Sequence, residues 1–449
     1  MRFLQLGCLA ALLFVWPIPH TIALRHILLM IALLLFGYSA YQIANRNSLK
    51  ILRLPVALYI ALTLWIIINA LFISPETSWA LVEIKGQWLM GLASLILGVF
   101  VALTAQNQKL FSSRTILLMI GGTLFAHVIY ADVSTLGTFI STGILPKRVG
   151  GLTEGMDKLN YLNNMLIAIL FTDCFFRITF HKRQLPFNTA LLALAIGLAL
   201  FGSYIEATRN GMVALLMLII SVTSLYWFEN RGRINPRLLI GGILLFLAAA
   251  ATFGYLSFKA DPRWQSLVDT IPIALDTTQH KAWLDDSKYP YPTLPTGEVV
   301  NGSNYSRIAW AKEGALLVRD HPLGIGYGRA AFGHGITAKY GEGIIGGHSH
   351  SGLIDFAVAT GLPGVGLWLA FVISLMYVAV KHYLMDNNPF ALILFFIVSG
   401  FSARMVVDSV IRDHMLEQFL FLVGFFAFAT VARMPNVANY KEITLPKKQ

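Results

Sequence analysis

Long apolar runs separated by short polar connections recur along almost the whole sequence. A bilayer core about 30 Å thick needs roughly 20 apolar residues in each spanning helix. Lipid offers no hydrogen-bond partners, so a spanning segment must satisfy its backbone internally, as a helix or in a closed barrel. The runs are too long for barrel strands and lack their two-residue alternation. The pattern therefore predicts an all-α polytopic membrane protein.

The runs predict about twelve transmembrane helices. The expected spans are residues 3–16, 22–41, 55–73, 88–103, 115–133, 162–180, 188–205, 211–228, 238–256, 362–380, 390–405 and 416–431. The first run is short and follows Arg2, as in a signal peptide. No small-x-small cleavage pattern follows it before Pro17, so we expect a retained helix.

Composition supports a membrane protein and excludes several other classes. Hydrophobic residues make up 56% of the chain and charged residues only 13%, against roughly 25% charged residues in soluble domains. The two cysteines, Cys8 and Cys174, lie in apolar runs and cannot build a disulfide framework or a zinc cluster. The net charge is +11. The basic residues lie largely at helix ends, where they meet lipid headgroups, so we expect no nucleic-acid partner.

Positive charge gathers in alternate connections, which predicts orientation because cytoplasmic loops carry an excess of Lys and Arg. One set of connections and adjoining helix ends holds eleven basic residues: Arg46, Lys50, Arg53, Lys109, Arg114, Arg177, Lys182, Arg183, Arg231, Arg233 and Arg237. The alternate set holds five: Lys85, Lys147, Arg148, Lys158 and Arg209. We therefore expect the first set and both termini to lie in the cytoplasm.

One connection, residues 259–349, is far longer than the others and is expected on the non-cytoplasmic side. Loops of this length are usually functional or carry helices of their own. It holds nine basic and nine acidic residues, so it is not a generic basic patch. Apolar residues at helical spacing predict a short amphipathic helix over 305–318. The expected divisions are residues 1–258 (nine helices), 259–349 (loop), 350–433 (three helices preceded by a half-helix) and 434–449 (cytoplasmic tail).

Two arginines on the expected non-cytoplasmic side are candidates for binding an anion. Arg209 lies in a turn between two spans, where a cation is costly unless it has a partner or a task; the alternative is a snorkelling helix-end arginine. Arg307 lies near the start of the expected amphipathic helix, and its alternative is a solvated loop arginine. Its local rivals are Lys312, Arg319 and Arg329. An arginine fork suits a diphosphate, because it donates several fixed hydrogen bonds and stays charged.

Two histidines, His348 and His350, precede an apolar run. The surrounding serines and histidines are also typical of a helix cap. A metal site with Asp355 is an alternative, but the pair lacks the His-x-x-x-His spacing of two ligands on one helical face. We therefore expect no metal, and a neutral histidine that accepts a proton from a hydroxyl. Asp408 and Arg412, in the last short loop, are candidates for orienting the histidine or binding an acceptor, with a solvated turn as the alternative.

The histidine segment resembles a known family signature. Residues 350–364 (HSGLIDFAVATGLPG) resemble the His-Asn…Leu…Glu-x-Gly…Gly signature of the bacterial O-antigen ligase and polymerase superfamily. Arg307 with Trp310, followed by residues 321–328 (HPLGIGYG), is similar to the arginine helix and His-Pro-x-x-Gly-x-Gly segment of that superfamily.

Two earlier segments extend the resemblance from about Arg148 to the C-terminus. Residues 208–211 (TRNG) resemble the Ser-Arg-Gly turn of the superfamily, and residues 148–151 (RVGG), with Asn160 and Asn163, resemble its Arg-x-x-Gly…Asn segment. Two positions depart from the pattern.

Ser351 replaces the usual Asn, and Ala359 stands where the family often has Glu, so no role of that acid is carried over. The register to Gly361 selects His350 over His348. Asp408 matches the acid that ligases tend to have in the last outer loop.

The resemblance implies an O-antigen ligase in the bacterial inner membrane with a periplasmic active site. Its donor would be a glycan on undecaprenyl diphosphate, and its acceptor a sugar hydroxyl of lipid A–core. No cofactor is expected, because this donor carries its own leaving group, and no nucleotide-binding motif occurs in the sequence. We expect Arg209 and Arg307 to hold the diphosphate and His350 to take the hydroxyl proton, without metal and with inversion of the anomeric centre.

Three alternatives remain open at this stage. An O-antigen polymerase would use the same donor but another lipid-linked repeat as acceptor. A protein O-oligosaccharyltransferase would use a Ser or Thr hydroxyl, and such enzymes often carry a larger C-terminal domain than the short tail here. A lipid-sugar transporter would also explain twelve spans, but usually places charged residues at mid-membrane depth, whereas the candidates here gather at one face.

Overall fold

The computed structural model describes residues 2–42, 50–106, 111–230, 267–341 and 347–431. Within these ranges the protein is helical, and its β-structure is limited to one isolated bridge between Thr293 and Val299. The expected all-α polytopic architecture is confirmed.

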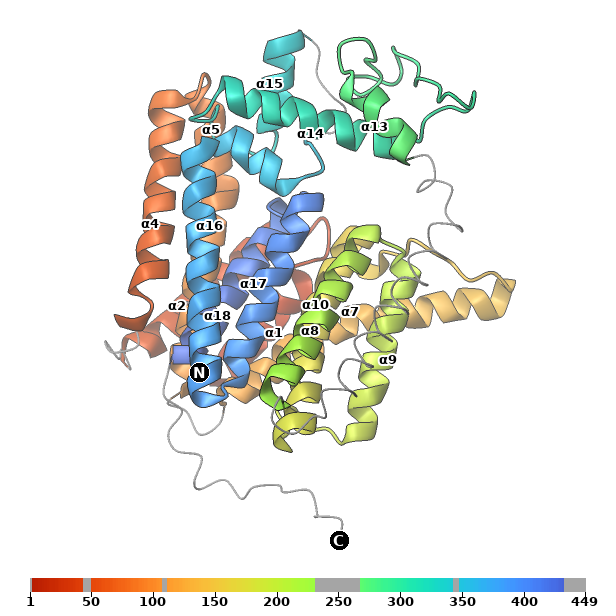
Figure 1. Cartoon of the computed structure of the whole chain (residues 1–449). Helices are drawn as coiled ribbons and strands as arrows, with labels where there is room; N and C mark the ends of the chain where they lie inside the picture. The colour runs from red at the N-terminus through yellow and green to blue at the C-terminus, as the bar shows by residue number, and fades with distance from the viewer. Residues whose placement is uncertain (1, 43–49, 107–110, 231–266, 342–346, 432–449) are drawn as a thin grey trace.

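The first half of the chain forms the larger part of the bundle (Figure 1). Its helices are α1 (Arg2–Val15), α2 (Ile22–Tyr41), α4 (Arg53–Ile68, extended by a π-helical turn at Asn69–Ile73), α5 (Thr77–Glu83), α6 (Leu89–Gln106, joined to α5 by a π-helical turn at Ile84–Trp88), α7 (Ser113–Thr142), α8 (Met156–Phe180), α9 (Thr189–Glu206) and α10 (Arg209–Asn230). The helices of the long connection are α13 (Leu267–Leu275), α14 (Gly302–Asp320) and α15 (Ala331–Tyr340). The chain then forms α16 (Gly352–Asp386), α17 (Pro389–Val407) and α18 (Asp413–Val431).

Nine helices in the described part of the chain are long and apolar enough to cross a membrane. Nine of the twelve expected spans fall on them, and the expected spans 3–16 and 211–228 fall on the shorter apolar helices α1 and α10. The span expected at 238–256 lies outside the described residues. The run expected at 115–133 is part of a longer helix, α7, which continues until Gly143 adopts a left-handed conformation that ends it.

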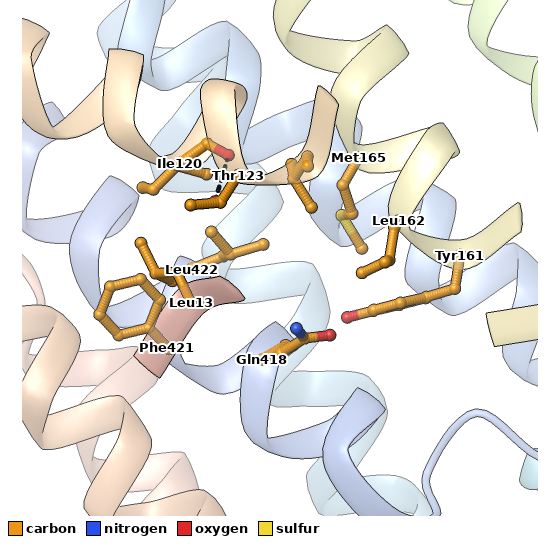
Figure 2. Close-up of a pocket in the computed structure, with 10 residues that line it drawn as sticks. Leu13, Ile120, Thr123, Tyr161, Leu162, Met165, Gln418, Phe421 and Leu422 are labelled. Carbon is orange, nitrogen blue, oxygen red and sulfur yellow. Dashed lines mark hydrogen bonds between the residues drawn. The ribbon is translucent and has the colours of Figure 1, made fainter. Parts of the chain in front are cut away.

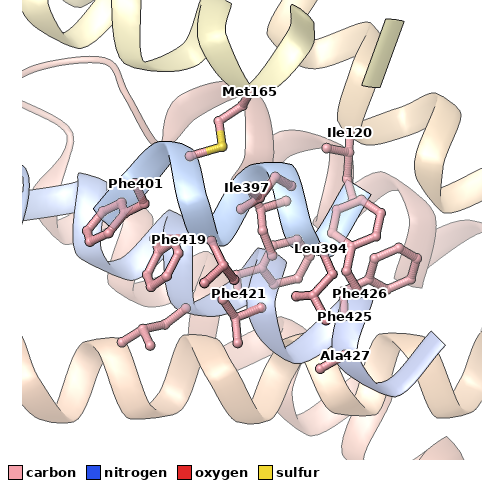
Figure 3. Packing of buried hydrophobic residues seen from close by; sticks show 14 of the residues in the cluster. Ile120, Met165, Leu394, Ile397, Phe401, Phe419, Phe421, Phe425, Phe426 and Ala427 are labelled. Atoms are coloured by element: carbon pink, nitrogen blue, oxygen red, sulfur yellow. The ribbon is translucent and has the colours of Figure 1, made fainter. Parts of the chain in front are cut away.

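The core of the bundle is built around α18, which is buried along His414–Val431. Its phenylalanines pack against α17 and α6, and the rings of Phe401 and Phe419 stack with centroids 3.8 Å apart (Figure 3). A side chain at Gly98 of α6 would collide with the backbone of Phe421, and one at Gly424 with that of Leu95. Glycine therefore allows α6 and α18 to touch through their backbones.

Helices α13, α14 and α15 lie across one end of the bundle, which we call the loop side (Figure 1). They share a separate apolar core that includes Trp283, Tyr305, Ala309 and Phe332. The amphipathic helix predicted at 305–318 is part of α14, which begins after Asn301 caps it through a side-chain bond to the Asn304 N–H. Helices α13, α14 and α15 therefore form a packed layer over the loop side of the bundle.

A kink at Gly361 divides α16 into a first part on the loop side and a long part in the bundle. Gly361 has φ 68° and ψ −174°, a conformation open essentially to glycine alone. The kink is fixed from both sides, because Trp65 donates to the Thr360 carbonyl at 2.7 Å and the Leu362 N–H donates to the Pro322 carbonyl at 2.8 Å. This kink holds the first part of α16, and the histidines before it, at a set angle.

Candidate functional site

Segments that are far apart in the sequence meet on the loop side. The Gly352 N–H donates to the Asp408 carbonyl at 3.0 Å, which joins the histidine segment to the loop between α17 and α18. The Gln87 side chain donates to the carbonyl of Ile411 in the same loop. The α14 helix, which carries Arg307, packs against α16. The histidine segment, the loop between α17 and α18, and α14 are therefore brought together by tertiary contacts.

The histidine segment has a tightly determined backbone. Ser351 caps α16 by accepting from the Ile354 N–H, so the helix cap expected as an alternative is present, and the histidines precede it. His350 has φ 57°, in the left-handed region, and its N–H donates to Nδ1 of His348 at 3.2 Å. The two rings have centroids 4.2 Å apart, and the His350 ring stacks on Trp310 of α14 at 5.2 Å.

A second set of polar contacts, from Ser409 and Asp355, lies beside His348. The Ser409 hydroxyl lies 3.2 Å from Nδ1 of His348 and 2.8 Å from Oδ2 of Asp355. The other oxygen of Asp355 accepts from the Ser349 N–H at 2.8 Å. Asp355 is 2% exposed and Ser409 is 6% exposed. These buried groups connect His348 to the first turn of α16 and to the last loop.

Both histidines are held neutral at ordinary pH. Burial lowers the pKa of His348 to about 3, and His350, Arg412 and Arg307 act in the same direction. Burial also lowers the pKa of His350, as do Arg307 and Arg412, while Asp408 opposes them. A neutral imidazole has one nitrogen with a free lone pair, which is what a proton acceptor requires.

Arg307 is exposed and has no partner among the described residues, whereas its sequence rivals are engaged elsewhere. Lys312 donates to the Leu275 carbonyl, Arg319 pairs with Asp320 at 2.9 Å, and Arg329 pairs with Glu83 at 2.8 Å. Arg412 also faces this site, and its buried Nε has no hydrogen-bond partner among the described residues. The two cations Arg307 and Arg412 are thus available to an anion beside the histidines.

Asp408 is held by Arg404, a buried arginine that the sequence analysis did not single out. Arg404 donates twice to Oδ2 of Asp408, at 3.0 and 2.9 Å. It also donates to Oδ1 of Asn160 at 2.7 Å and to the Asp157 carbonyl at 2.6 Å. Asn160 in turn donates to Glu206 at 2.6 Å. The Asp408 carboxylate is therefore a fixed member of a buried network rather than a solvated turn residue.

Two further candidates lie at the edge of this network. Arg148 is exposed, has φ 64°, and is within electrostatic range of Asp157, as are Arg307 and Arg404. Arg209 is the first residue of α10, and its side chain lies outside the described residues. A side chain at Gly211, two residues later, would collide with Asn160. The start of α10 is therefore packed beside the residue that Arg404 binds.

The metal site considered as an alternative and an apolar cavity of the bundle do not add to this cluster. Within the described ranges, no three His, Cys, Asp or Glu side chains gather where they could hold a metal ion. Figure 2 shows a cavity inside the bundle, lined largely by apolar side chains, with Gln418 and Tyr161 as polar members. It contains none of the candidate residues.

Sequence reasoning missed Arg404, Ser409, Trp310 as a ring partner, and the support that Asp355 gives to His348. Arg404 lies near the end of an apolar span, where a buried cation marks a functional site, and that signal was present in the sequence. Ser409 carries no such signal, because a serine beside Asp408 in a short loop is ordinary. Only the fold places it between a histidine and a carboxylate.

One family model matches part of the chain. Residues 191–369 match the family model described as O-antigen ligase. The match begins in α9 and ends within α16, so it contains Arg209, Arg307, His348 and His350. No curated protein matches the sequence significantly. The chain is thus a multi-pass membrane protein in which residues 191–369 are similar to the O-antigen ligase family, and this match supports a membrane glycosyltransferase of the ligase or polymerase type.

Proposed function

We propose that this protein is an O-antigen ligase, which transfers a glycan from undecaprenyl diphosphate to a sugar hydroxyl of lipid A–core. The observation that carries the proposal is the meeting of free cations and a neutral histidine on the loop side. Arg307 and Arg412 influence both His348 and His350 electrostatically. An anionic leaving group and a base that acts on a neighbouring hydroxyl need this combination.

In the proposed reaction the acceptor oxygen attacks the anomeric carbon of the donor sugar. A new carbon–oxygen bond forms while the bond to the diphosphate breaks, and the electron pair leaves with the phosphate oxygen. His350 takes the hydroxyl proton. Arg307 and Arg209 stabilise the charge that accumulates on the diphosphate. Arg148, which acts electrostatically on Asp157, is a further cation at the edge of the site. A single displacement of this kind inverts the anomeric centre.

His350 is the better base of the two histidines for a geometric reason. A backbone N–H is always a donor, so the bond from the His350 N–H leaves Nδ1 of His348 without a proton. Neutral His348 then carries its proton on Nε2 and offers the substrate no free lone pair. His350 has no such constraint among the described hydrogen bonds, and Trp310 fixes its ring plane. This assignment agrees with the register that selected His350 from the sequence.

The proposed orientation places the loop side in the periplasm of a bacterial inner membrane, with both termini in the cytoplasm. The alternation of basic residues along the sequence supports it, because eleven lie in one set of connections and helix ends and five in the alternate set. The isoprenoid tail of the donor would remain in the bilayer while its diphosphate meets the arginines. The cations at this site support a reaction without metal, since they can take over the role of a divalent ion on the diphosphate.

An O-antigen polymerase is the second candidate, because it would use the same donor, arginines and base. The acceptor separates the two functions. The test is to combine purified protein, undecaprenyl-diphosphate-linked O-antigen and lipid A–core in detergent, without nucleotide and with excess EDTA. A ladder of glycosylated lipid A–core that His350→Ala loses is the expected result. Longer chains on the lipid carrier alone would establish the polymerase, and restoration of a chelator-blocked reaction by Mg²⁺ or Mn²⁺ would overturn metal independence.

A further inference from the structure

The His350 N–H sets the hydrogen-bonding state of His348, and a buried serine and a buried carboxylate lie beside the same ring nitrogen. Nδ1 of His348 is approached by two groups, the His350 N–H and the Ser409 hydroxyl, each at 3.2 Å. The first of these can only donate. Nδ1 must therefore be an acceptor, and the proton of the neutral ring must be on Nε2.

The second approach is consistent with this state. Ser409 has one proton to donate, and it lies 2.8 Å from Asp355 and 3.2 Å from His348. Asp355 is anchored by the Ser349 N–H and packs in the first turn of α16, so it cannot swing away. When the Ser409 hydroxyl donates to Nδ1, it adds a second bond to His348; when it donates to Asp355, the bond from the His350 N–H holds the Nδ1 edge and the Ser409 oxygen packs beside it. Its opposite edge, Nε2, has no bond to any described residue.

From this geometry we propose that His348 is a substrate-binding hydrogen-bond donor, whose Nε2–H binds a phosphate oxygen of the lipid diphosphate, and that Ser409 and Asp355 are its positioning residues. This role rests on the proposed function and adds a second histidine with a task different from that of His350. The charges of Arg307 and Arg412 attract the diphosphate. A neutral N–H donor complements them, because its directed hydrogen bond orients one phosphate oxygen.

The neighbouring groups favour a phosphate oxygen over the acceptor sugar as the partner of Nε2. Arg412 and Arg307 act on the ring in addition to burial and His350, which lower its pKa most, whereas the Asp355 carboxylate is engaged by Ser349 and Ser409. An anionic oxygen is the ligand that such surroundings attract. The acceptor hydroxyl belongs instead beside His350, which must receive its proton.

Glutamine is the substitution that tests this role, because its side-chain amide can place an N–H near the position of Nε2 but cannot act as a base at neutral pH. The probe is undecaprenyl diphosphate itself, whose binding to the purified full-length protein is measured by competition with the lipid-linked glycan. We expect His348→Ala to weaken binding about tenfold, as for the loss of one charge-assisted hydrogen bond, and His348→Gln to recover most of that loss.

The transfer assay provides the second readout. The acid limb of the pH dependence of kcat/KM should be the same in His348→Gln as in the wild type, since His348 does not titrate as the base. His350→Gln should lose transfer while it still binds the diphosphate. Ser409→Ala and Asp355→Asn should weaken diphosphate binding in part, whereas Asp386→Asn, at the exposed far end of α16, should not change it.

Two results would overturn the role of His348. One is diphosphate binding by His348→Ala equal to that of the wild type. The other is a His348→Gln variant as weak as His348→Ala in binding, or with a displaced acid limb, which would make His348 the base. A wild-type protein that transfers no glycan contradicts the proposed function, whereas the order of binding among the variants decides the role of His348 independently.

Discussion

The core around α18 and the site on the loop side are built by opposite means. The core is a set of phenylalanine, leucine and glycine contacts between neighbouring spans, in which Gly98 and Gly424 let two backbones touch. The site depends on a few directed bonds between α8, α14, the start of α16 and the last loop. Packing in the core tolerates little added volume, while the site tolerates little loss of hydrogen-bonding groups.

This difference predicts which property each kind of mutation should change. Changes in the core should reduce the amount of folded protein, and any change in activity should follow from that loss. Changes at the site should alter catalysis or its pH dependence while most of the protein stays folded. Arg404 is the exception, since it is both deeply buried in the bundle and bound to the site.

The largest effect is expected from Gly98→Leu, because the new side chain would collide with the backbone of α18. Overpacking at a backbone contact belongs to the exceptional class of mutations that cost more than about 4 kcal/mol. Size-exclusion chromatography in detergent should show loss of the monodisperse protein. Gly121→Leu, where nothing lies within 4 Å of the added Cβ, is the control and should behave as the wild type. A folded Gly98→Leu variant would contradict the close α6–α18 contact.

Arg404→Met should damage both stability and activity. It leaves the Asp408 carboxylate without its partner, and removing one member of a buried ion pair costs roughly 3–5 kcal/mol. The last loop would then no longer hold the histidine segment, and misplacement of this kind costs about 100-fold in rate. Thermal unfolding and the transfer assay measure the two effects. Arg319→Met, which removes an exposed pair with Asp320, should change neither.

Trp310→Ala should lower kcat by about tenfold, because an aromatic stack of this kind contributes about 0.5–1.5 kcal/mol. The ring of His350 would lose the surface that fixes its plane. Trp310→Phe keeps an aromatic ring there and should retain most of the activity, with an unfolding midpoint close to that of the wild type. Equal losses of kcat in the two variants would show that Trp310 acts through the hydrogen bond from its indole N–H to the Trp283 carbonyl, and not through the stack on His350.

The smallest expected effect is a shift in pH dependence caused by Arg412→Gln. The charge of Arg412 lowers the pKa of His350, so its removal raises that pKa. His350 must be unprotonated to accept the hydroxyl proton, and the acid limb of kcat/KM should therefore move to higher pH. Arg319→Gln, on an exposed face of α14, is the matched control and should leave the limb in place. A limb that moves to lower pH would show that Arg412 does not face the base.

The periodicity and length of the apolar runs were sufficient to predict the membrane bundle. A lipid-facing or buried helix must be apolar over its length, so its signal is continuous in the sequence. The helix ends were less predictable: α7 extends to Thr142 because Ser and Thr residues can continue a helix beyond the apolar run, and it ends only where Gly143 turns. The local sequence therefore predicts that a spanning helix exists more accurately than it predicts the residues at which the helix begins and ends.

The sequence by itself determined the helical class and most spans, and it indicated the candidate residues Arg307, His348, His350, Asp408 and Arg412. It did so because burial in lipid and the cost of charge near it leave a strong local pattern. Only the tertiary structure decided that Arg404 holds Asp408, that Trp310 stacks on His350, and that Ser409 joins His348 to Asp355. The contacts of Ser409 connect residues up to 61 positions apart, and the bond from Arg404 to Asn160 spans 244 positions. Hydrogen bonds between such distant groups leave no periodic signal along the chain.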